Sequence, residues 1–284
     1  MSGRGSHRPS LRTIAKRTLA GALGEGPRSI LVAASGGPDS QALLDVVAGL
    51  REELGIVVRA HGVDHGLRAA AAGELDLAEA LADRLGVEFS RTKLRLERGG
   101  NLQARARAAR YAALRDAAAG ALVATGHHAD DRAETVLLRM LRGTSIGSLA
   151  VLPPRAGDLV RPLIAARRSD VLLHLSRHRI PSATDPSNED PRFVRSRLRR
   201  EVLPLLSTIA PRVVEHLCAL ADEAIELGTG ADASVDLPKP TRDAIQKLLR
   251  TARTSPEKAR KAQILLPGGL VLGLAAPHRK NRVP

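Results

Sequence analysis

Aromatic side chains are almost missing from this 284-residue chain, which has no tryptophan, one tyrosine and two phenylalanines. Modules that bind single-stranded nucleic acid by stacking its bases use aromatic platforms, so a dedicated module of that kind is disfavoured. A single cysteine, Cys218, excludes an intrachain disulfide and any cluster or zinc site built on several thiolates. We expect Cys218 to be a buried structural residue.

Long apolar runs are lacking as well. No stretch approaches the roughly 20 apolar residues that a membrane helix needs, and the basic start MSGRGSHRPSLRT has no apolar segment of a signal peptide behind it. We therefore expect no membrane partner and a cytoplasmic location. The length allows one large domain with a small appendage.

Acidic residues are outnumbered by basic ones, 30 to 44, which gives a formal net charge of +14. Such a charge favours a polyanionic partner, and nucleic acid is the first candidate. The plain alternative is a composition rich in alanine and arginine whose charges only cover solvated faces.

The apolar pattern alternates between strands and helices, which predicts an α/β fold with a doubly wound parallel sheet. The expected strands are 29–35, 56–65, 87–96 and 121–128, and the expected helices are 11–23, 38–54, 71–86, 101–120 and 130–143. Ligands of such sheets lie beyond the carboxyl ends of the strands. The turns SGGPDS, HGVDHGLR and TGHHADD should therefore converge.

The alternation is expected to stop near Leu152, where a loop-rich, arginine-dense extension begins. Further helices are expected at 169–180 and 211–228, followed by a polar linker at 229–240. The predicted organisation is a basic leader with the first helix (1–27), a nucleotide-binding domain (28–210), and a mainly helical extension with a short C-terminal appendage (211–284).

The stretch SGGPDS, residues 35–40, joins the first expected strand to a helix with proline in its first turn. Glycines there let backbone amides approach an anion at the helix N-terminus. The chain has no Gly-Lys pair for a Walker A loop, and Ser40 has the wrong offset for a G-x-S-x-G elbow. Asp39 would repel phosphate unless a divalent cation bridges them, which predicts a triphosphate with Mg²⁺. Alternatively, Asp39 only complements the helix dipole.

Five motifs in order resemble one enzyme family. SGGPDS is similar to the SGGxDS loop of the N-type ATP pyrophosphatases, called the PP-loop. Within that group, four further stretches resemble the tRNA(Ile)-lysidine synthetases: HGVDHGLR (61–68), NLQARARAARYAAL (101–114), TGHHADDRAETVLLRMLRG (125–143) and DPSNEDPRFVRSRLRREVLP (185–204). Together they cover residues 28 to 206, which is far more specific than one motif.

This resemblance implies a PP-loop ATP pyrophosphatase domain and a ligase that uses ATP and Mg²⁺. The implied partners are free L-lysine and the tRNA(Ile) with a CAU anticodon, whose wobble cytidine is adenylated and then joined to lysine, with release of pyrophosphate and AMP. A homodimer is left open as the oligomeric state.

The resemblance also implies roles for individual residues. The catalytic residues it implies are Asp39 for Mg²⁺, Asp131 for lysine recognition, His127 near the nucleotide, and Arg195 and Arg199 for charge stabilisation during phosphoryl transfer. The residues assigned to the nucleotide are Ser35, Gly36, Gly37, Pro38, Asp39, Ser40, His61, Asp64 and His127.

Several alternatives stay open. The stretch 127–131 could instead hold a metal, Asp130 and Asp131 could cap the next helix, and Asp64 could cap a turn. The roles of three residues are undecided: Glu134, and Arg105 and Arg110, which face either RNA or local carboxylates. Departures from the family pattern stand at Gln103, Thr184, Ser196 and Arg200.

Two rival functions remain. A tRNA-thiolating enzyme of the same superfamily normally needs paired cysteines, whereas this sequence has only Cys218. A non-catalytic basic RNA-binding protein with the same fold is the rival from another class.

Overall fold

The computed structural model describes residues 9–24, 28–64, 71–94, 102–143, 145–183, 194–229, 263–265 and 271–273. The chain divides into two units, 1–227 and 228–284. The first unit runs past the predicted boundary at residue 210. In the second unit, β7 (Gln263–Leu265) and β8 (Val271–Gly273) pair antiparallel.

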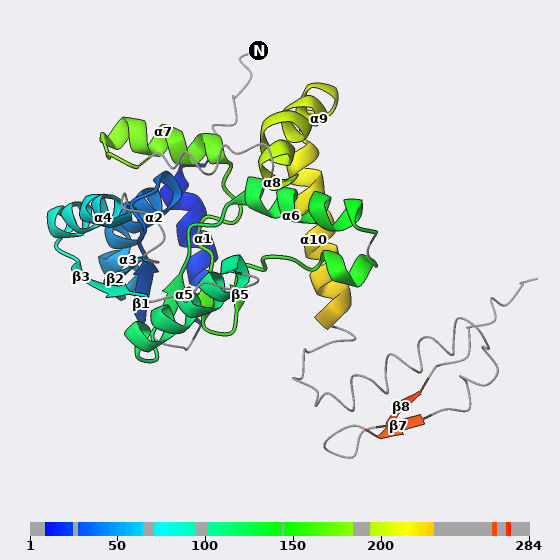
Figure 1. Cartoon of the computed structure of the whole chain (residues 1–284), viewed down its shortest axis with the longest axis horizontal. Helices are drawn as coiled ribbons and strands as arrows, with labels where there is room; N and C mark the ends of the chain where they lie inside the picture. The colour runs from blue at the N-terminus through cyan, green and yellow to red at the C-terminus, as the bar shows by residue number, and fades with distance from the viewer. Residues whose placement is uncertain are drawn as a thin grey trace, which may run out of the picture. The chain divides into compact units, whose positions relative to one another are not determined.

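A six-stranded sheet forms the centre of the first unit, in the order β3-β2-β1-β4-β6-β5 (Figure 1). Its strands are β1 (Ser29–Ala33), β2 (Val57–Asp64), β3 (Glu88–Lys93), β4 (Leu122–Ala124), β5 (Arg155–Ala156) and β6 (Leu159–Val160). All neighbours are parallel except β5 and β6. The predicted α/β fold with a parallel sheet is confirmed.

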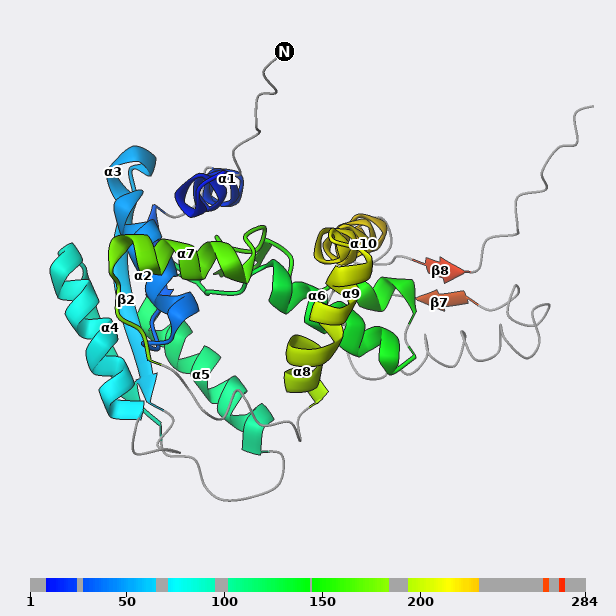
Figure 2. The ribbon, with the colours of Figure 1, turned by 90° about the horizontal axis from the view of Figure 1, so that it is seen from above.

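Helices cover both faces of this sheet. The helices on these faces are α1 (Leu11–Leu23), α2 (Pro38–Gly49), α4 (Ala71–Leu85), α5 (Leu102–Ala118) and α7 (Arg168–His178). The first unit also contains α3 (Arg51–Leu54), α6 (Ala129–Leu141) and η1 (Ile146–Leu149), of which α6 and η1 contribute to a separate core. Alternate residues of a strand point to opposite faces. Ile30 and Val32 therefore pack into the core with α1, α2, α4 and α7, whereas Leu31 packs with Tyr111 and Leu114 of α5. Helix α7 lies alongside α2 (Figure 2).

Two expectations for the chain beyond Leu152 are wrong. Strand β6 extends the sheet, because Val123 of β4 pairs in parallel with Leu159. The arginine-dense part from Val194 onward is helical rather than loop-rich, and it forms α8 (Val194–Arg197), the π-helical η3 (Leu198–Val202) and α9 (Leu203–Ile209). The expected helix near 211–228 is confirmed as α10 (Val213–Thr229).

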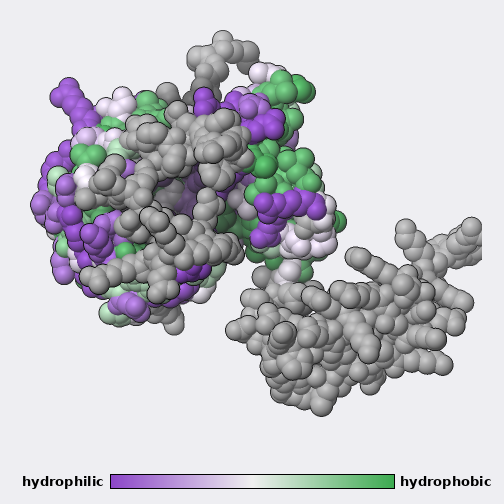
Figure 3. All heavy atoms as spheres, in the orientation of Figure 1, coloured by the Kyte–Doolittle hydropathy of each residue, from purple (hydrophilic) through white to green (hydrophobic). Residues whose placement is uncertain are grey.

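A second, smaller core joins α6 to α10. Ala133 and Val136 of α6 pack with Val214, Leu217 and Ala221 of α10. The outer side of this layer is rich in hydrophobic side chains (Figure 3), and the exposed ones include Leu205, Ile209, Leu220 and Leu227.

No single helix in the described part of the chain is long and apolar enough to cross a membrane. The helical stretches Val194–Ile209 and Val213–Gly228 are bent by 101° relative to each other, and only together are they long and apolar enough for a membrane span.

Candidate active site

The loop between β1 and α2 is held so tightly that it requires glycine. Gly36 has a φ of +77°, a left-handed conformation that favours glycine. A Cβ atom there would lie 1.9 Å from the carbonyl oxygen of Glu74 in α4. From the other side, the amide of Ala183 donates to the carbonyl of Gly36 over 2.8 Å. The loop is therefore fixed between α4 and the segment that follows α7.

Two serine hydroxyls complete the loop. The hydroxyl of Ser40 donates to the carbonyl of Gly37 over 2.9 Å and accepts from the amide of Ser35 over 3.1 Å. The hydroxyl of Ser35 also bonds to that of Ser40 over 3.1 Å, and Ser35 is exposed. These bonds fix the shape of the loop at the start of a 12-residue helix, whose N-terminus favours an anion.

The turn after β4 comes directly against this loop. A Cβ atom on Gly126 would lie 2.8 Å from the carbonyl oxygen of Asp39, so the two backbones touch. The predicted convergence of SGGPDS and TGHHADD at the carboxyl edge of the sheet is therefore confirmed.

Asp39 points its carboxylate into the junction of these two turns. Its Oδ1 is buried and forms no hydrogen bond to any described residue, while Nε2 of His128 lies 3.6 Å away. Oδ2 lies 3.8 Å from Nη1 of Arg168. Burial raises the pKa of Asp39, only partly offset by the attraction of His128. A buried, unsatisfied carboxylate oxygen beside a phosphate-type loop fits a divalent cation.

Helix α6 begins at His128, which acts as its N-cap. Nδ1 of His128 accepts from the amide of Asp131 over 3.3 Å, and the carboxylate of Asp131 accepts from the amide of His128 over 3.1 Å. This reciprocal pair is a capping box. Capping by Asp131, one of the alternatives above, is therefore confirmed.

The buried acids of α6 are held by two arginines of the next helical layer. Nε of Arg195 donates to Glu134 over 2.8 Å, and Nε of Arg199 donates to Glu134 over 2.6 Å. The same two guanidinium groups reach Oδ1 of Asp131 over 3.1 and 3.0 Å. We call these four residues the acid–arginine clasp. Glu134 is fully buried, so it anchors the arginines.

The clasp keeps Asp131 ionised. Burial alone would raise the pKa of Asp131, but the attraction of His128, Arg195 and Arg199 together outweighs it and lowers that pKa below its usual value. The pKa of the neighbouring Arg199 guanidinium shifts in the opposite direction. Burial lowers its pKa, but the hydrogen bond to Glu134 and the negative charges of Glu134 and Asp131 together outweigh burial and raise it.

Two residues predicted to contact the nucleotide, His127 and His61, have different surroundings from each other. Nδ1 of His127 bonds to the hydroxyl of Thr125 over 3.0 Å, and burial lowers the pKa of His127 to about 4. His127 is thus neutral at pH 7. His61 is buried in β2, where its ring nitrogens bond to the β3 hydroxyls of Ser90 and Thr92 over 2.7 and 3.1 Å. Its ring is thus engaged in the fold, and its nucleotide contact stays a prediction.

Sequence reasoning missed two arginines at the start of α7. Arg167 donates to the carboxylate of Asp130 over 3.2 Å, and the amide of Arg168 donates to the same carboxylate over 2.7 Å. The guanidinium of Arg168 also lies near the carboxylate of Asp39. An Arg-Arg pair before an expected helix, in the stretch AARRSD, is the signal that could have found them.

A further group of arginines lies on α5. The guanidinium groups of Arg107 and Arg110 lie over the ring of Tyr111, 5.0 and 5.3 Å from its centre. Both repel a proton on His127, as does the buried Arg161. Arg105 is exposed. None of these positions distinguishes RNA from local carboxylates as the partner.

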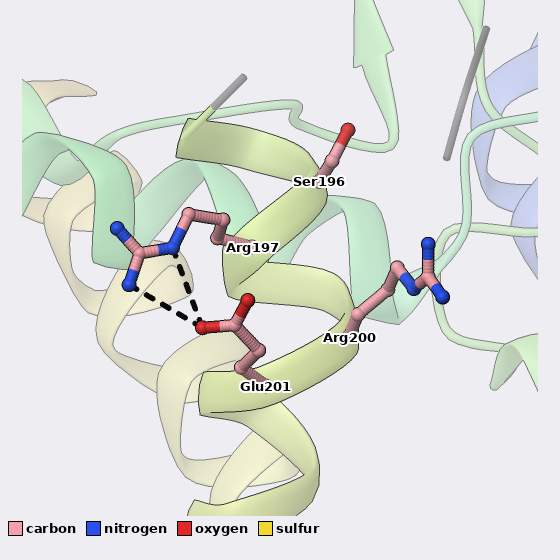
Figure 4. Close-up of a pocket in the computed structure, with 4 residues that line it drawn as sticks. All are labelled: Ser196, Arg197, Arg200 and Glu201. Carbon is pink, nitrogen blue, oxygen red and sulfur yellow. Dashed lines mark hydrogen bonds and ion pairs between the residues drawn. The ribbon is translucent and has the colours of Figure 1, made fainter. Parts of the chain in front are cut away.

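A pocket opens on α8 and η3, lined by Ser196, Arg197, Arg200 and Glu201 (Figure 4). Arg197 and Glu201 turn toward each other and form an ion pair, whereas Arg200 points to the other side of the helix (Figure 4). This pocket holds both departures from the family pattern at Ser196 and Arg200. Thr184 and the side chain of Gln103 lie outside the described residues.

Cys218 is half-buried against the α6–α10 core, and its Sγ donates to the carbonyl of Ala129 over 3.4 Å. Burial raises the pKa of this thiol to about 11. These facts agree with a structural cysteine.

Comparison with known proteins gives a consistent result. Residues 10–206 match the family model of the PP-loop domain. The tRNA(Ile)-lysidine synthase of Thermobifida fusca is 40% identical over 232 residues, which cover 78% of this chain and 69% of that protein. The enzyme of the same name from Pseudomonas aeruginosa is 38% identical over 67% of this chain and 44% of its own length. The chain thus spans less than half of the latter.

Among solved structures, the U34-tRNA thiolase NcsA of Methanococcus maripaludis, described with its [4Fe-4S] cluster, superposes with a TM-score of 0.64. The match covers 84% of this chain and 90% of that one at 16% identity, so it shows a shared fold alone.

Proposed function

Since the chain belongs to the tRNA(Ile)-lysidine synthase family, with a PP-loop domain at residues 10–206, we propose that it joins L-lysine to the wobble cytidine of a tRNA(Ile) with a CAU anticodon. The family and ligase class expected from the sequence are confirmed by these matches. The observation that supports the activity itself is the junction of three features: the phosphate loop, the buried Asp39 Oδ1 that bonds to no described residue, and the acid–arginine clasp.

The first half-reaction uses the loop. The cytidine O2 attacks the α-phosphorus of ATP, an adenylated cytidine forms, and pyrophosphate leaves. Ser35, Gly36, Gly37 and Ser40 supply amides and hydroxyls for the departing pyrophosphate, with Pro38 fixing the helix start. Asp39 would hold Mg²⁺, which neutralises phosphate charge when bound.

The second half-reaction uses the clasp. The ε-ammonium of lysine first gives one proton to solvent. Its free amine then attacks C2 of the adenylated cytidine, the C2–O bond to the phosphate breaks, and AMP leaves with the second proton of the amine. Asp131 stays ionised and can pair with that ammonium before proton loss. Arg195 is the more exposed of its two arginine partners, 47% against 28%, so we assign Arg195 to turn from Asp131 toward the phosphate.

His127 is assigned to the nucleotide and not to proton transfer. A group with a pKa of about 4 takes up a proton poorly at pH 7, so His127 is a weak general base. As a neutral ring bonded to Thr125, it can contact the base or ribose of ATP from the β4 turn. Asp64, at the end of β2, is assigned to the same nucleotide.

The decisive test is incorporation of labelled lysine into a tRNA(Ile) transcript with a CAU anticodon, with ATP and Mg²⁺ present. A methionine tRNA sharing that anticodon is the matched control. Incorporation into the isoleucine transcript alone supports the proposal. Pyrophosphate release without lysine transfer would instead favour another transfer reaction, such as thiolation, and neither signal would favour a binding protein.

Asp39→Ala tests the loop within that reaction. We expect ATP turnover to be lost while tRNA binding measured by filter retention is kept, because the change removes the cation ligand and no basic group. Asp158→Ala, at a partly exposed aspartate paired with Arg115, is the control and should keep both properties. Unaltered turnover in Asp39→Ala would refute the cation role.

A further inference from the structure

A second group of metal-ligating side chains lies between α2 and α7, away from the phosphate loop. It consists of Asp45 on α2 with His174 and His178 on α7, whose ligand atoms all lie within 4.8 Å of one another. Nε2 of His174 is 2.8 Å from Oδ2 of Asp45, and the two imidazole rings stack with centres 4.2 Å apart. We propose that these three side chains bind one transition-metal dication of the Zn²⁺ type.

The donor set fits such an ion. Residues four apart on a helix share one face, so both imidazoles point the same way from α7, and Asp45 approaches from the facing helix. Two imidazoles and one carboxylate are ligands that Zn²⁺ accepts, with water in the fourth position. Bonds of about 2.0 Å in a tetrahedron place ligand atoms about 3.3 Å apart. That separation is longer than the 2.8 Å between His174 and Asp45 and shorter than the 4.8 Å within which all three ligand atoms lie.

Burial also suits an exchangeable ion. Asp45 and His174 are half-buried, and His178 is exposed, so the ion can enter from solvent on the His178 side. The plain alternative is a hydrogen bond between His174 and Asp45 that only ties two helices together. That bond accounts for two of the residues, and it does not require His178 to stack over His174.

The proposed ion would restrict movement of the phosphate loop by linking α2 to α7. Helix α2 begins beside that loop, and the segment after α7 bonds to it through Ala183 and Gly36. Gln41 of α2 donates to the carbonyl of Pro181 over 3.1 Å, which makes a second link between the same elements. Asp45 follows Asp39 by six residues, or about 9 Å along a helix, so the two cation sites are distinct.

Zinc binding to the full chain tests the proposal. The protein is freed of metal with a chelator, and Zn²⁺ is titrated against a chromogenic chelator. We expect the wild type to bind one more zinc ion than His178→Ala, or to bind it at least about tenfold more tightly. His178 is exposed, so its removal leaves the fold intact.

Controls separate this site from others. His216→Ala removes an exposed histidine of α10 and should bind zinc as the wild type does. Cobalt should give the intense visible absorption of a tetrahedral site in the wild type, and Asp45→Asn should lose it. Equal zinc affinity and stoichiometry in the wild type and His178→Ala would overturn the proposal.

Discussion

At the scale of single residues, Gly36 shows how closely the loop is packed. Gly36→Ala places a methyl group 1.9 Å from a backbone oxygen at a φ of +77°, so we expect the free energy of unfolding to fall by about 2–4 kcal/mol. Gly55→Ala is the matched control, since φ is +60° there and nothing lies within 4 Å. It should cost only about 1 kcal/mol. Urea denaturation measures both, and equal losses would contradict the packing argument.

His127 gives the fold a pH dependence of predictable sign. Its pKa is about 4 in the folded chain, against the ordinary value of 6.5 expected when the chain is unfolded, so between these values the unfolded chain binds more protons. Stability should therefore fall as the pH drops from about 7 to about 4. His127→Gln should show a smaller fall in urea denaturation over this range. His216→Gln, at an exposed histidine, should follow the wild type, and parallel curves for all three would contradict the assignment.

At the scale of helices, the acid–arginine clasp ties α6 to the layer of α8 and η3. Arg199→Ala leaves the fully buried Glu134 with one partner fewer, so we expect a loss of about 2 kcal/mol in urea denaturation. Arg197→Ala, two residues away, breaks an exposed pair with Glu201 and should cost less than about 0.5 kcal/mol. A similar small loss of stability in both variants would show that the buried contacts of Glu134 add little to the free energy of unfolding.

Elements whose apolar residues repeat with a clear period were predictable from the sequence, and short or irregular elements were not. Helices such as α1 and α6 follow the apolar spacing of the sequence closely. Strands β5 and β6 have two residues each, too few to show a period. Pairing with β4 fixes β6, and pairing with β6 in turn fixes β5. The four-residue spacing of Arg195 and Arg199 indicates one helix face, but their shared partner, Glu134, is 61 and 65 residues away in sequence. Only the fold brings it there.

At the scale of the whole molecule, the meeting of loops at one sheet edge followed from topology. Parallel strands put their carboxyl ends together, so the loop of Asp39 and the turn of His127 had to converge. The two arginines at the start of α7 could not be placed in the same way, because the sequence showed no strand between Leu152 and that helix. Once β6 extends the sheet beside β4, the chain after it returns to the same edge, and Arg168 reaches Asp39.

The division of the chain into two units leads to the last prediction. All the apolar core clusters found among the described residues lie within the first unit, and α10 completes the cluster to which α6 contributes. A chain ending at residue 229 should therefore keep its own cores, and its thermal midpoint should stay within about 2 °C of that of the full chain, since 1 kcal/mol shifts a domain of this size by about 2–4 °C. A chain ending at residue 210 is the contrast. It lacks α10, exposes the α6 side of that core, and should unfold well below both. If removing 230–284 lowered the midpoint as much as removing α10 does, the second unit would have to share a core with the first.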